Sequence, residues 1–247
     1  MKNIAIILPV CNECANLKRN FDKIYSAAKK LGSFEIIIAE DGSTDCTRSI
    51  AKKYARLPNV KLVTSRNRLG KGGGIKAAMS AARADVVGYM DIDLSVPLDY
   101  LEKAVRLVNE GNEIVVGSRY VSGSNIDRSP LRYSLSAAYN LMIRALFNSS
   151  VHDHQCGFKF FKGKYSARIA SEITENGWFF DSELLIRAQQ EGIIPYELPV
   201  AWREHKETKI RMIDVFVFIR SMMGFRLNPS SHTKIFKTGR EKDSIIA

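Results

Sequence analysis

The stretch VVGYMDIDLS, residues 86–95, decides the fold of this chain, because in it a short apolar strand runs directly into two aspartates. Residues 86–90 are continuously apolar, as expected for a strand that is buried on both faces of a parallel sheet. In open α/β sheets, ligands bind at the carboxyl ends of the strands. Asp91 and Asp93 can converge there on one divalent cation, and Mg²⁺ or Mn²⁺ needs only one or two carboxylates together with substrate phosphates. The stretch therefore predicts a metal–diphosphate site.

On both sides of this stretch, short β-branched strands alternate with helical segments. The expected strands are 4–10, 34–39, 60–64, 86–90 and 114–117, and the expected helices between them are 15–31, 45–56, 73–83 and 97–109. This order predicts an α/β fold, with a mostly parallel, mixed central sheet and helices on both faces.

The regular alternation of strands and helices ends in the second half of the chain. Residues 122–130 read as a loop, and the elements expected beyond it are helices over 131–147, 165–174 and 181–191 and strands over 156–161 and 193–200. No linker, repeat or low-complexity tract separates the two halves. We therefore expect one domain over residues 1–210, made of a half at 1–120 and a half at 121–210.

Composition excludes several classes of protein. The 247 residues are 45% hydrophobic and 26% charged, which is typical of a globular chain with a sizeable core. No apolar run reaches the ~18–20 residues of a transmembrane helix, and the first residues lack a signal-peptide core, so we expect an unprocessed chain whose domain begins at Met1. The net charge of +11 favours an anionic partner, which charge alone leaves open between nucleic acid, an anionic membrane and a phosphorylated substrate.

The four cysteines, Cys11, Cys14, Cys46 and Cys156, have no spacing typical of a disulfide framework. Cys11 and Cys14 form a CxxC pattern, but the second pair that a zinc site needs is missing from the sequence. A redox role for this pair is the alternative to our prediction of reduced thiols.

Residues 211–247 form a basic, amphipathic C-terminal segment. Within residues 201–242 there are ten Lys and Arg against four Asp and Glu, and residues 213–225 are strongly apolar. This apolar run is too short to span a bilayer but suits a helix that lies at a membrane surface. A core helix that closes the domain is an equal alternative.

Polar groups also follow other strands at the same predicted edge. Asp41, in the turn EDGSTD at 40–45, could accept hydrogen bonds from a nucleobase or ribose, or the turn could merely cap the next helix. Lys71 precedes three glycines that could approach a phosphate or simply pack closely, although the sequence is no P-loop. Arg119 and Arg132 carry the guanidinium geometry that suits phosphate, with a solvated surface as the ordinary alternative.

Together these motifs resemble the family 2 glycosyltransferases with a GT-A fold, especially the branch that loads sugars onto dolichyl or polyprenyl phosphate. The matching segments are PVCNE at 9–13, EDGSTD at 40–45, DIDLS at 91–95 and GSRY at 117–120. Residues 67–73, QCGFKFF at 155–161 and FDSELL at 180–185 are most similar to dolichyl-phosphate β-glucosyltransferases. The resemblance covers residues 4–210 and implies a single GT-A-type domain.

The resemblance also implies a set of site residues. Those expected to contact the donor, its metal or the acceptor phosphate are Pro9, Cys11, Glu13, Ala39, Asp41, Lys71, Asp91, Ile92, Asp93, Ser95, Arg119, Arg132 and Lys209. Mg²⁺ or Mn²⁺ would be held by Asp91, Asp93 and Ser95. Asp93, Asp181 and Arg119 would act in catalysis, with Asp153 as the alternative to Asp181 for orienting the acceptor. The chain departs from the family pattern at Cys11, which replaces an aromatic residue, at Glu40, which replaces an aspartate, and at Thr208, which replaces a serine.

The implied function is the inverting transfer of a hexose, with glucose and UDP favoured, from a nucleotide diphosphate sugar to dolichyl or polyprenyl phosphate. The implied partners are these two substrates and a membrane surface, not nucleic acid, and the implied location is the cytosolic face of a membrane. Alternatives are a GDP-mannose donor, a soluble or polymer sugar acceptor and, more distantly, a basic nucleic-acid-binding protein, which the acidic strand ends disfavour.

Overall fold

The structure is a computed structural model that describes residues 3–204, 212–227 and 235. Lys209 and most of the basic C-terminal segment lie outside the described residues. The strands are β1 (Ile4–Val10), β2 (Phe34–Asp41), β3 (Val60–Ser65), β4 (Val86–Met90), β5 (Ile114–Ser118), β6 (Asn125–Asp127), β7 (Phe158–Lys162), β8 (Tyr196–Pro199) and β9 (Ala201–Arg203). The helices are α1 (Cys14–Lys30), α2 (Thr47–Tyr54), α3 (Lys71–Ala81), α4 (Asp99–Asn109), α5 (Pro130–Phe147), the 3₁₀ turn η1 (Gly163–Tyr165), α6 (Ser166–Glu172), α7 (Phe180–Gln190) and α8 (Met212–Leu227).

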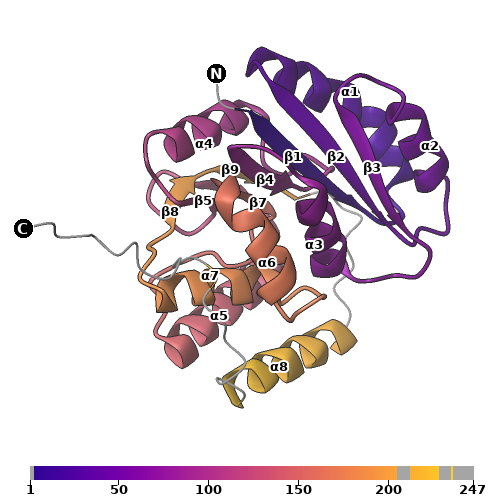
Figure 1. The fold of residues 1–247 in the computed structure, drawn as a ribbon. Helices are drawn as coiled ribbons and strands as arrows, with labels where there is room; N and C mark the ends of the chain where they lie inside the picture. Colours follow the sequence, from indigo (N-terminus) through magenta and orange to yellow (C-terminus); the bar gives the residue numbers. More distant parts are fainter. Residues whose placement is uncertain (1–2, 205–211, 228–234, 236–247) are drawn as a thin grey trace, which may run out of the picture.

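Seven strands form one mixed sheet in the order β3-β2-β1-β4-β7-β5-β8 (Figure 1). Neighbouring strands are parallel except where β7 runs antiparallel between β4 and β5. The reversed strand brings the chain back to the end of β4, so the residues just before β7 lie next to the two aspartates at 91 and 93. The predicted fold class, an α/β domain with a mostly parallel mixed sheet, is confirmed.

Helices cover both faces of the sheet because the side chains of each buried strand alternate between two apolar layers. In β1, Ile6 and Leu8 pack with Leu17 and Phe21 of α1 on one face, whereas Ile7 joins the cluster of α3, α6 and α7 on the other. These strands are apolar on both sides, which is why they appear in the sequence as continuous runs.

Boundary differences from the expected elements have local causes. Helix α3 starts at Lys71, two residues earlier than expected, because Gly72 and Gly73 donate their amides to carbonyl groups of residues 176–177 and pack too closely for a side chain. Strands β6 and β9 form a separate two-stranded parallel sheet within the expected loop and beyond the last expected strand. Three-residue strands carry no detectable periodicity.

Helix α8 lies near α5 (Figure 1). Its buried side chains Met222 and Phe225 pack against α5 and α7, and the ring of Phe225 contacts those of Phe147 and Phe179. The side chains of Met223 and Leu227 are exposed. This part of the apolar segment therefore contributes to the core and also presents apolar surface. In the described part of the chain, every helix is too short or too polar to cross a membrane.

Candidate active site

A cleft of about 650 Å³ opens at the carboxyl ends of the central strands. Eleven of the residues expected at the site line it: Pro9, Cys11, Glu13, Ala39, Asp41, Lys71, Asp91, Ile92, Asp93, Ser95 and Arg119. The sheet topology explains this convergence, because β1, β2 and β4 are adjacent and parallel and so end at the same edge.

One wall of the cleft is built by the turns after β1 and β2. Asn12, in a left-handed conformation at φ 57°, accepts hydrogen bonds from the amides of Thr44 at 2.8 Å and Asp45 at 3.4 Å. In return, Thr47 Oγ1 accepts from the Glu13 amide at 2.8 Å. Ser43 and Asp45 likewise accept from the amides of Asn12 and Cys14, and Asp45 also accepts from the Thr47 amide at the start of α2.

Cys14 and Cys46 form a disulfide between these two turns. The prediction of reduced thiols is wrong for this pair: the residues are 32 positions apart, but neighbouring parallel strands bring their Cα atoms to 5.4 Å. Cys11 stays free and half-buried at the cleft, and Cys156 is a buried free thiol whose pKa burial raises to about 12. Near Asp45, both sulfurs are consumed by the disulfide, so no thiolate is left there for a metal.

Asp41, at the end of β2, lies buried at the base of the cleft, with 4% of its surface exposed. Its two carboxylate oxygens accept hydrogen bonds from the amides of Leu69 at 2.6 Å and Gly70 at 2.9 Å. Asp41 thereby fixes the loop that leads into α3. Glu40 is turned away and accepts from the Arg48 guanidinium at 2.6 Å and the Ser43 amide at 2.7 Å, so it stabilises the turn instead of lining the cleft.

The acidic centre of the cleft is Asp91 and Asp93. Asp93 accepts hydrogen bonds from the amide and the hydroxyl of Ser95, both at 2.9 Å, around the left-handed Leu94. Burial and the neighbouring Asp93 raise the pKa of Asp91, and the Lys71 ammonium at 2.9 Å opposes this shift. Two close carboxylates and a hydroxyl are hard oxygen donors, so the residues present fit Mg²⁺ or Mn²⁺.

Lys71 occupies the first position of α3, where its ammonium lies between Asp91 and the face of Trp178, 5.3 Å from the ring centroid. Burial alone would lower its pKa, but the carboxylates of Asp91 and Asp181 raise it above the ordinary value. The Lys71 ammonium therefore stays protonated, in a fixed position beside the acidic centre. The glycines that follow it serve packing: a Cβ on Gly72 would clash with Phe180 at 2.5 Å.

Arg119 forms the opposite side of the cleft. Its Nε and Nη2 donate to the two oxygens of Asp153 at 2.7 and 2.8 Å, and its backbone amide donates at 2.9 Å. Burial alone would lower the pKa of Arg119, but the Asp153 carboxylate raises it above the usual value. Burial alone would raise the pKa of Asp153, but the Arg119 guanidinium holds it below the usual value. This buried bidentate pair fixes the Arg119 guanidinium at the lining of the cleft.

The remaining expected residues lie elsewhere. Arg132 is outside the lining and donates from Nη1 to Glu204 at 2.7 Å. Asp181 is 3% exposed and also outside the lining; it accepts from Tyr89 at 2.5 Å and Lys159 at 2.6 Å behind the acidic centre. Within the sequence HDH at 152–154, Asp153 accepts the hydrogen bonds of Arg119. The neighbouring His154 is buried, which lowers its pKa to about 3.

Several residues that the sequence does not predict at the site also line the cleft: Asn16, Arg19, Arg68, Gln155, Gly157, Trp178 and Trp202. The two tryptophans of the chain are both in this set. Their rarity was the one available signal, since aromatic faces are common in ligand sites.

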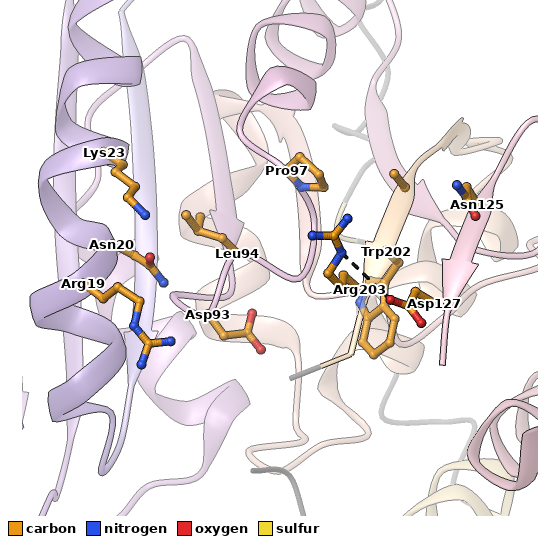
Figure 2. Close-up of a pocket in the computed structure, with 11 residues that line it drawn as sticks. Arg19, Asn20, Lys23, Asp93, Leu94, Pro97, Asn125, Asp127, Trp202 and Arg203 are labelled. Carbon is orange, nitrogen blue, oxygen red and sulfur yellow. Dashed lines mark ion pairs between the residues drawn. The ribbon is translucent and has the colours of Figure 1, made fainter. Parts of the chain in front are cut away.

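A smaller hollow of about 370 Å³ adjoins the cleft and shares Arg19, Asp93 and Trp202 with it. Figure 2 shows Arg19 and Lys23 of α1 facing Asp93 from one side, with Asp127 and Arg203 of the β6–β9 sheet on the other. Arg203 and Asp127 form a loose ion pair at 4.0 Å, and both are largely exposed.

This chain resembles known proteins in sequence and in fold. The model of the family described as glycosyl transferase family 2 matches residues 5–169. Glycosyltransferase AglD of Haloferax volcanii is 34% identical over 85% of this chain and 34% of its own length, and the dolichyl-phosphate beta-glucosyltransferase ALG5A of Trichomonas vaginalis is 31% identical over 85% of this chain and 68% of its own. The chain thus spans about a third of the length of the first relative. Glucosyl-3-phosphoglycerate synthase from Mycobacterium tuberculosis, solved with Mn²⁺, UDP and phosphoglyceric acid, superposes with a TM-score of 0.65 at 18% identity, covering 93% of this chain and 78% of that one.

Proposed function

Because the chain belongs to glycosyl transferase family 2, we propose that it moves a hexose, with glucose and a UDP donor favoured, to the phosphate of a dolichyl or polyprenyl lipid. One observation carries this proposal: Asp91, Asp93 and the paired Arg119 line a single cleft, where the carboxylates would bind a metal–diphosphate and the arginine a second phosphate. The dolichyl-phosphate glucosyltransferase similarity points to the same pair of substrates.

Donor binding would use the two turns and the acidic centre. The wall at Pro9, Cys11 and Ala39 would contact the base and ribose, and Asp91 and Asp93 would hold Mg²⁺ or Mn²⁺ with Ser95 orienting Asp93. A divalent cation there supplies charge neutralisation for the leaving diphosphate. Lys71 adds a second positive charge from the protein itself.

The acceptor would be oriented by arginine. Arg119, with Arg132 and Lys209 as further expected contacts, would place a phosphate oxygen for attack on the anomeric carbon from the face opposite the diphosphate, which inverts that carbon. A phosphate monoester has a second pKa near ~6, so it is already a nucleophilic dianion at neutral pH. No general base is then required, and the buried, hydrogen-bonded position of Asp181 suits a positioning role behind the site.

We place the protein at the cytosolic face of a membrane as a peripheral enzyme. Support comes from the net charge of +11 and from α5, where Leu131 and Leu135 are 72% and 51% exposed on either side of Arg132. These leucines lie four residues apart, on one face of the helix, and such a face suits the boundary of a bilayer.

The test is transfer of radiolabel to lipid. Purified protein is incubated with labelled UDP-glucose, UDP-GlcNAc or GDP-mannose, with Mn²⁺ or Mg²⁺ and dolichyl phosphate in detergent, and the organic phase is counted. Lipid-bound label is expected from UDP-glucose, with loss on EDTA and in Asp93→Ala but not in Asp99→Ala, a matched change at an exposed aspartate of α4. Donor hydrolysis without labelled lipid would instead favour a soluble acceptor, and absence of donor binding would reject the proposed function.

A further inference from the structure

Arg128, in the turn between β6 and α5, has a donor group that its surroundings leave unused. Its side chain is 9% exposed, and its Nη1 is fully buried without a hydrogen-bond partner among the described residues. Its Nε reaches Glu204 only at 3.4 Å. A buried, unpaired donor on a charged group is costly and uncommon in folded proteins, so its position calls for an explanation.

The carboxylate of Glu204 lies between Arg128 and Arg132. Its Oε1 accepts from Arg132 Nη1 at 2.7 Å and weakly from Arg128, and its Oε2 accepts from the Ser129 amide at 3.2 Å. Although burial would raise the pKa of Glu204, the hydrogen bonds from Arg132 and Ser129 hold it below its usual value. An ionised carboxylate therefore lies between the two guanidinium groups, and Arg128 Nη1 still has no hydrogen-bond partner among the described residues.

The site formed by Arg128, Arg132 and Glu204 adjoins the cleft at Trp202. The indole of Trp202 lies 5.3 Å from the guanidinium carbon of Arg119 and 5.1 Å from that of Arg128. Trp202 and Arg119 both line the cleft. Asp153 is committed to Arg119, whereas Glu204 pairs with both Arg128 and Arg132.

We propose that Glu204 occupies the place of a phosphate monoester on Arg128 and Arg132, and that the acceptor phosphate binds there by displacing it. The inference rests on the proposed function and adds to it a competing carboxylate and an unassigned phosphate ligand, Arg128. A phosphate monoester brings three acceptor oxygens and nearly two negative charges, so it satisfies the unused Nη1 of Arg128 where a carboxylate does not. Glu204, at 16% exposed, lies near enough to the surface to move away.

The test measures phosphate binding without any donor. Calorimetry gives the Kd of the full chain for glycerol 3-phosphate and for a short polyprenyl phosphate in detergent, and in a Trp178→Phe background the emission of Trp202 reports binding at this place. Glu204→Gln is expected to lower the Kd at least 5-fold. Asp127→Asn, which removes the same charge from an exposed position of the same small sheet, is expected to change it less than 2-fold.

The contribution of Arg128 to phosphate binding is tested by removing its positive charge. Arg128→Gln is expected to raise the Kd at least 10-fold and to abolish the gain from Glu204→Gln, whereas Arg203→Gln on β9 changes it less than 2-fold. Arg128→Lys keeps the positive charge but loses the paired donors of the planar guanidinium, so it is expected to recover only part of the affinity. Tighter binding of the polyprenyl phosphate than of glycerol 3-phosphate would identify a lipid source, and the reverse a soluble one.

Unchanged or weaker phosphate binding in folded Glu204→Gln, or unchanged binding in Arg128→Gln, would overturn the inference. Folding of each variant is checked by circular dichroism and thermal unfolding. Failure of the proposed function is separate, because it shows as absence of label transfer by the wild-type protein whatever the phosphate affinities are.

Discussion

The carboxylate of Asp91 rests directly on the backbone of Gly157: a Cβ atom at Gly157 would lie 2.0 Å from Asp91 Oδ2. The Asp91 amide also donates to the Gly157 carbonyl at 3.0 Å. The residue that precedes β7 therefore sets the position of an acidic side chain that follows β4.

Gly157→Ala is expected to reduce sugar transfer at least 100-fold, because the added methyl group pushes Asp91 out of line with Asp93. Thermal unfolding is expected to show a loss of about 1–3 kcal/mol in stability, as for other overpacked sites. Gly224→Ala on α8, where a Cβ meets nothing within 4 Å, is the control and should retain activity. Full activity in Gly157→Ala would show that the Asp91 position is not critical.

Lys71→Met is expected to raise the affinity for Mn²⁺ alone by about 10-fold, since the Lys71 ammonium, 2.9 Å from Asp91, would compete with the cation for this carboxylate. The same variant should bind UDP with Mn²⁺ more weakly, because a positive charge facing the diphosphate is lost. Free Mn²⁺ measured by electron paramagnetic resonance, with and without UDP, separates the two effects. Lys52→Met, at an exposed position of α2, should alter neither.

The free energy of unfolding is expected to fall as the pH drops from 6.5 to 5. Burial lowers the pKa of His154 from 6.5 to about 3, so the unfolded chain takes up a proton in this range and the folded protein does not. Stability is therefore fully present above pH 6.5 and decreases by about 2 kcal/mol by pH 5. Urea titrations at several pH values should show this slope in wild type and in His152→Gln, and a flat profile in His154→Gln would confirm its origin.

Reduction of the Cys14–Cys46 disulfide is expected to destabilise the protein by about 3–4 kcal/mol, the loop-entropy value for a closure of this length. Binding of UDP should weaken as well, because the disulfide joins the two turns that wall the cleft. Thermal unfolding with and without a phosphine reductant tests this. The shift should persist in Cys11→Ser and disappear in the Cys14→Ser/Cys46→Ser double variant; an identical shift in the double variant would contradict the assignment.

Replacing Leu131 and Leu135 by serine is expected to reduce co-sedimentation with vesicles of phosphatidylcholine and phosphatidylglycerol at least 5-fold, because both leucines are largely exposed on α5. Leu57→Ser, at an exposed leucine after α2, is the comparison. Equal sedimentation of the two variants would remove α5 from the membrane-binding surface.

Much of the fold could be predicted from the sequence because the central strands are apolar on both faces. Residues 86–90 and 4–10 were assigned with the bounds that the structure has, and their parallel order placed most of the cleft. The reversal of β7 could not be predicted, since the pattern of a five-residue strand with a buried Lys159 carries no information on direction.

The candidate site was predictable where its residues directly follow strands. Asp91 and Arg119 directly follow β4 and β5, Asp41 is the last residue of β2, and all three line the cleft. Arg132 was expected beside Arg119, but it pairs with Glu204, 72 positions away, and no local pattern shows which carboxylate a distant turn will deliver. Cys14 and Cys46 illustrate the same limit, because strand adjacency rather than spacing brings them together.

Residues 153–159 have a consequence for how such a protein can change over time. Asp153 anchors Arg119, Gly157 supports Asp91, and Lys159 donates to the carbonyl groups of His154 and Cys156 at 3.1 and 2.7 Å. An insertion or deletion within these seven residues would alter the separation between the two halves of the cleft. The positions of Asp91 and Arg119 are therefore coupled through one short segment, whereas β6 and β9 form a separate sheet.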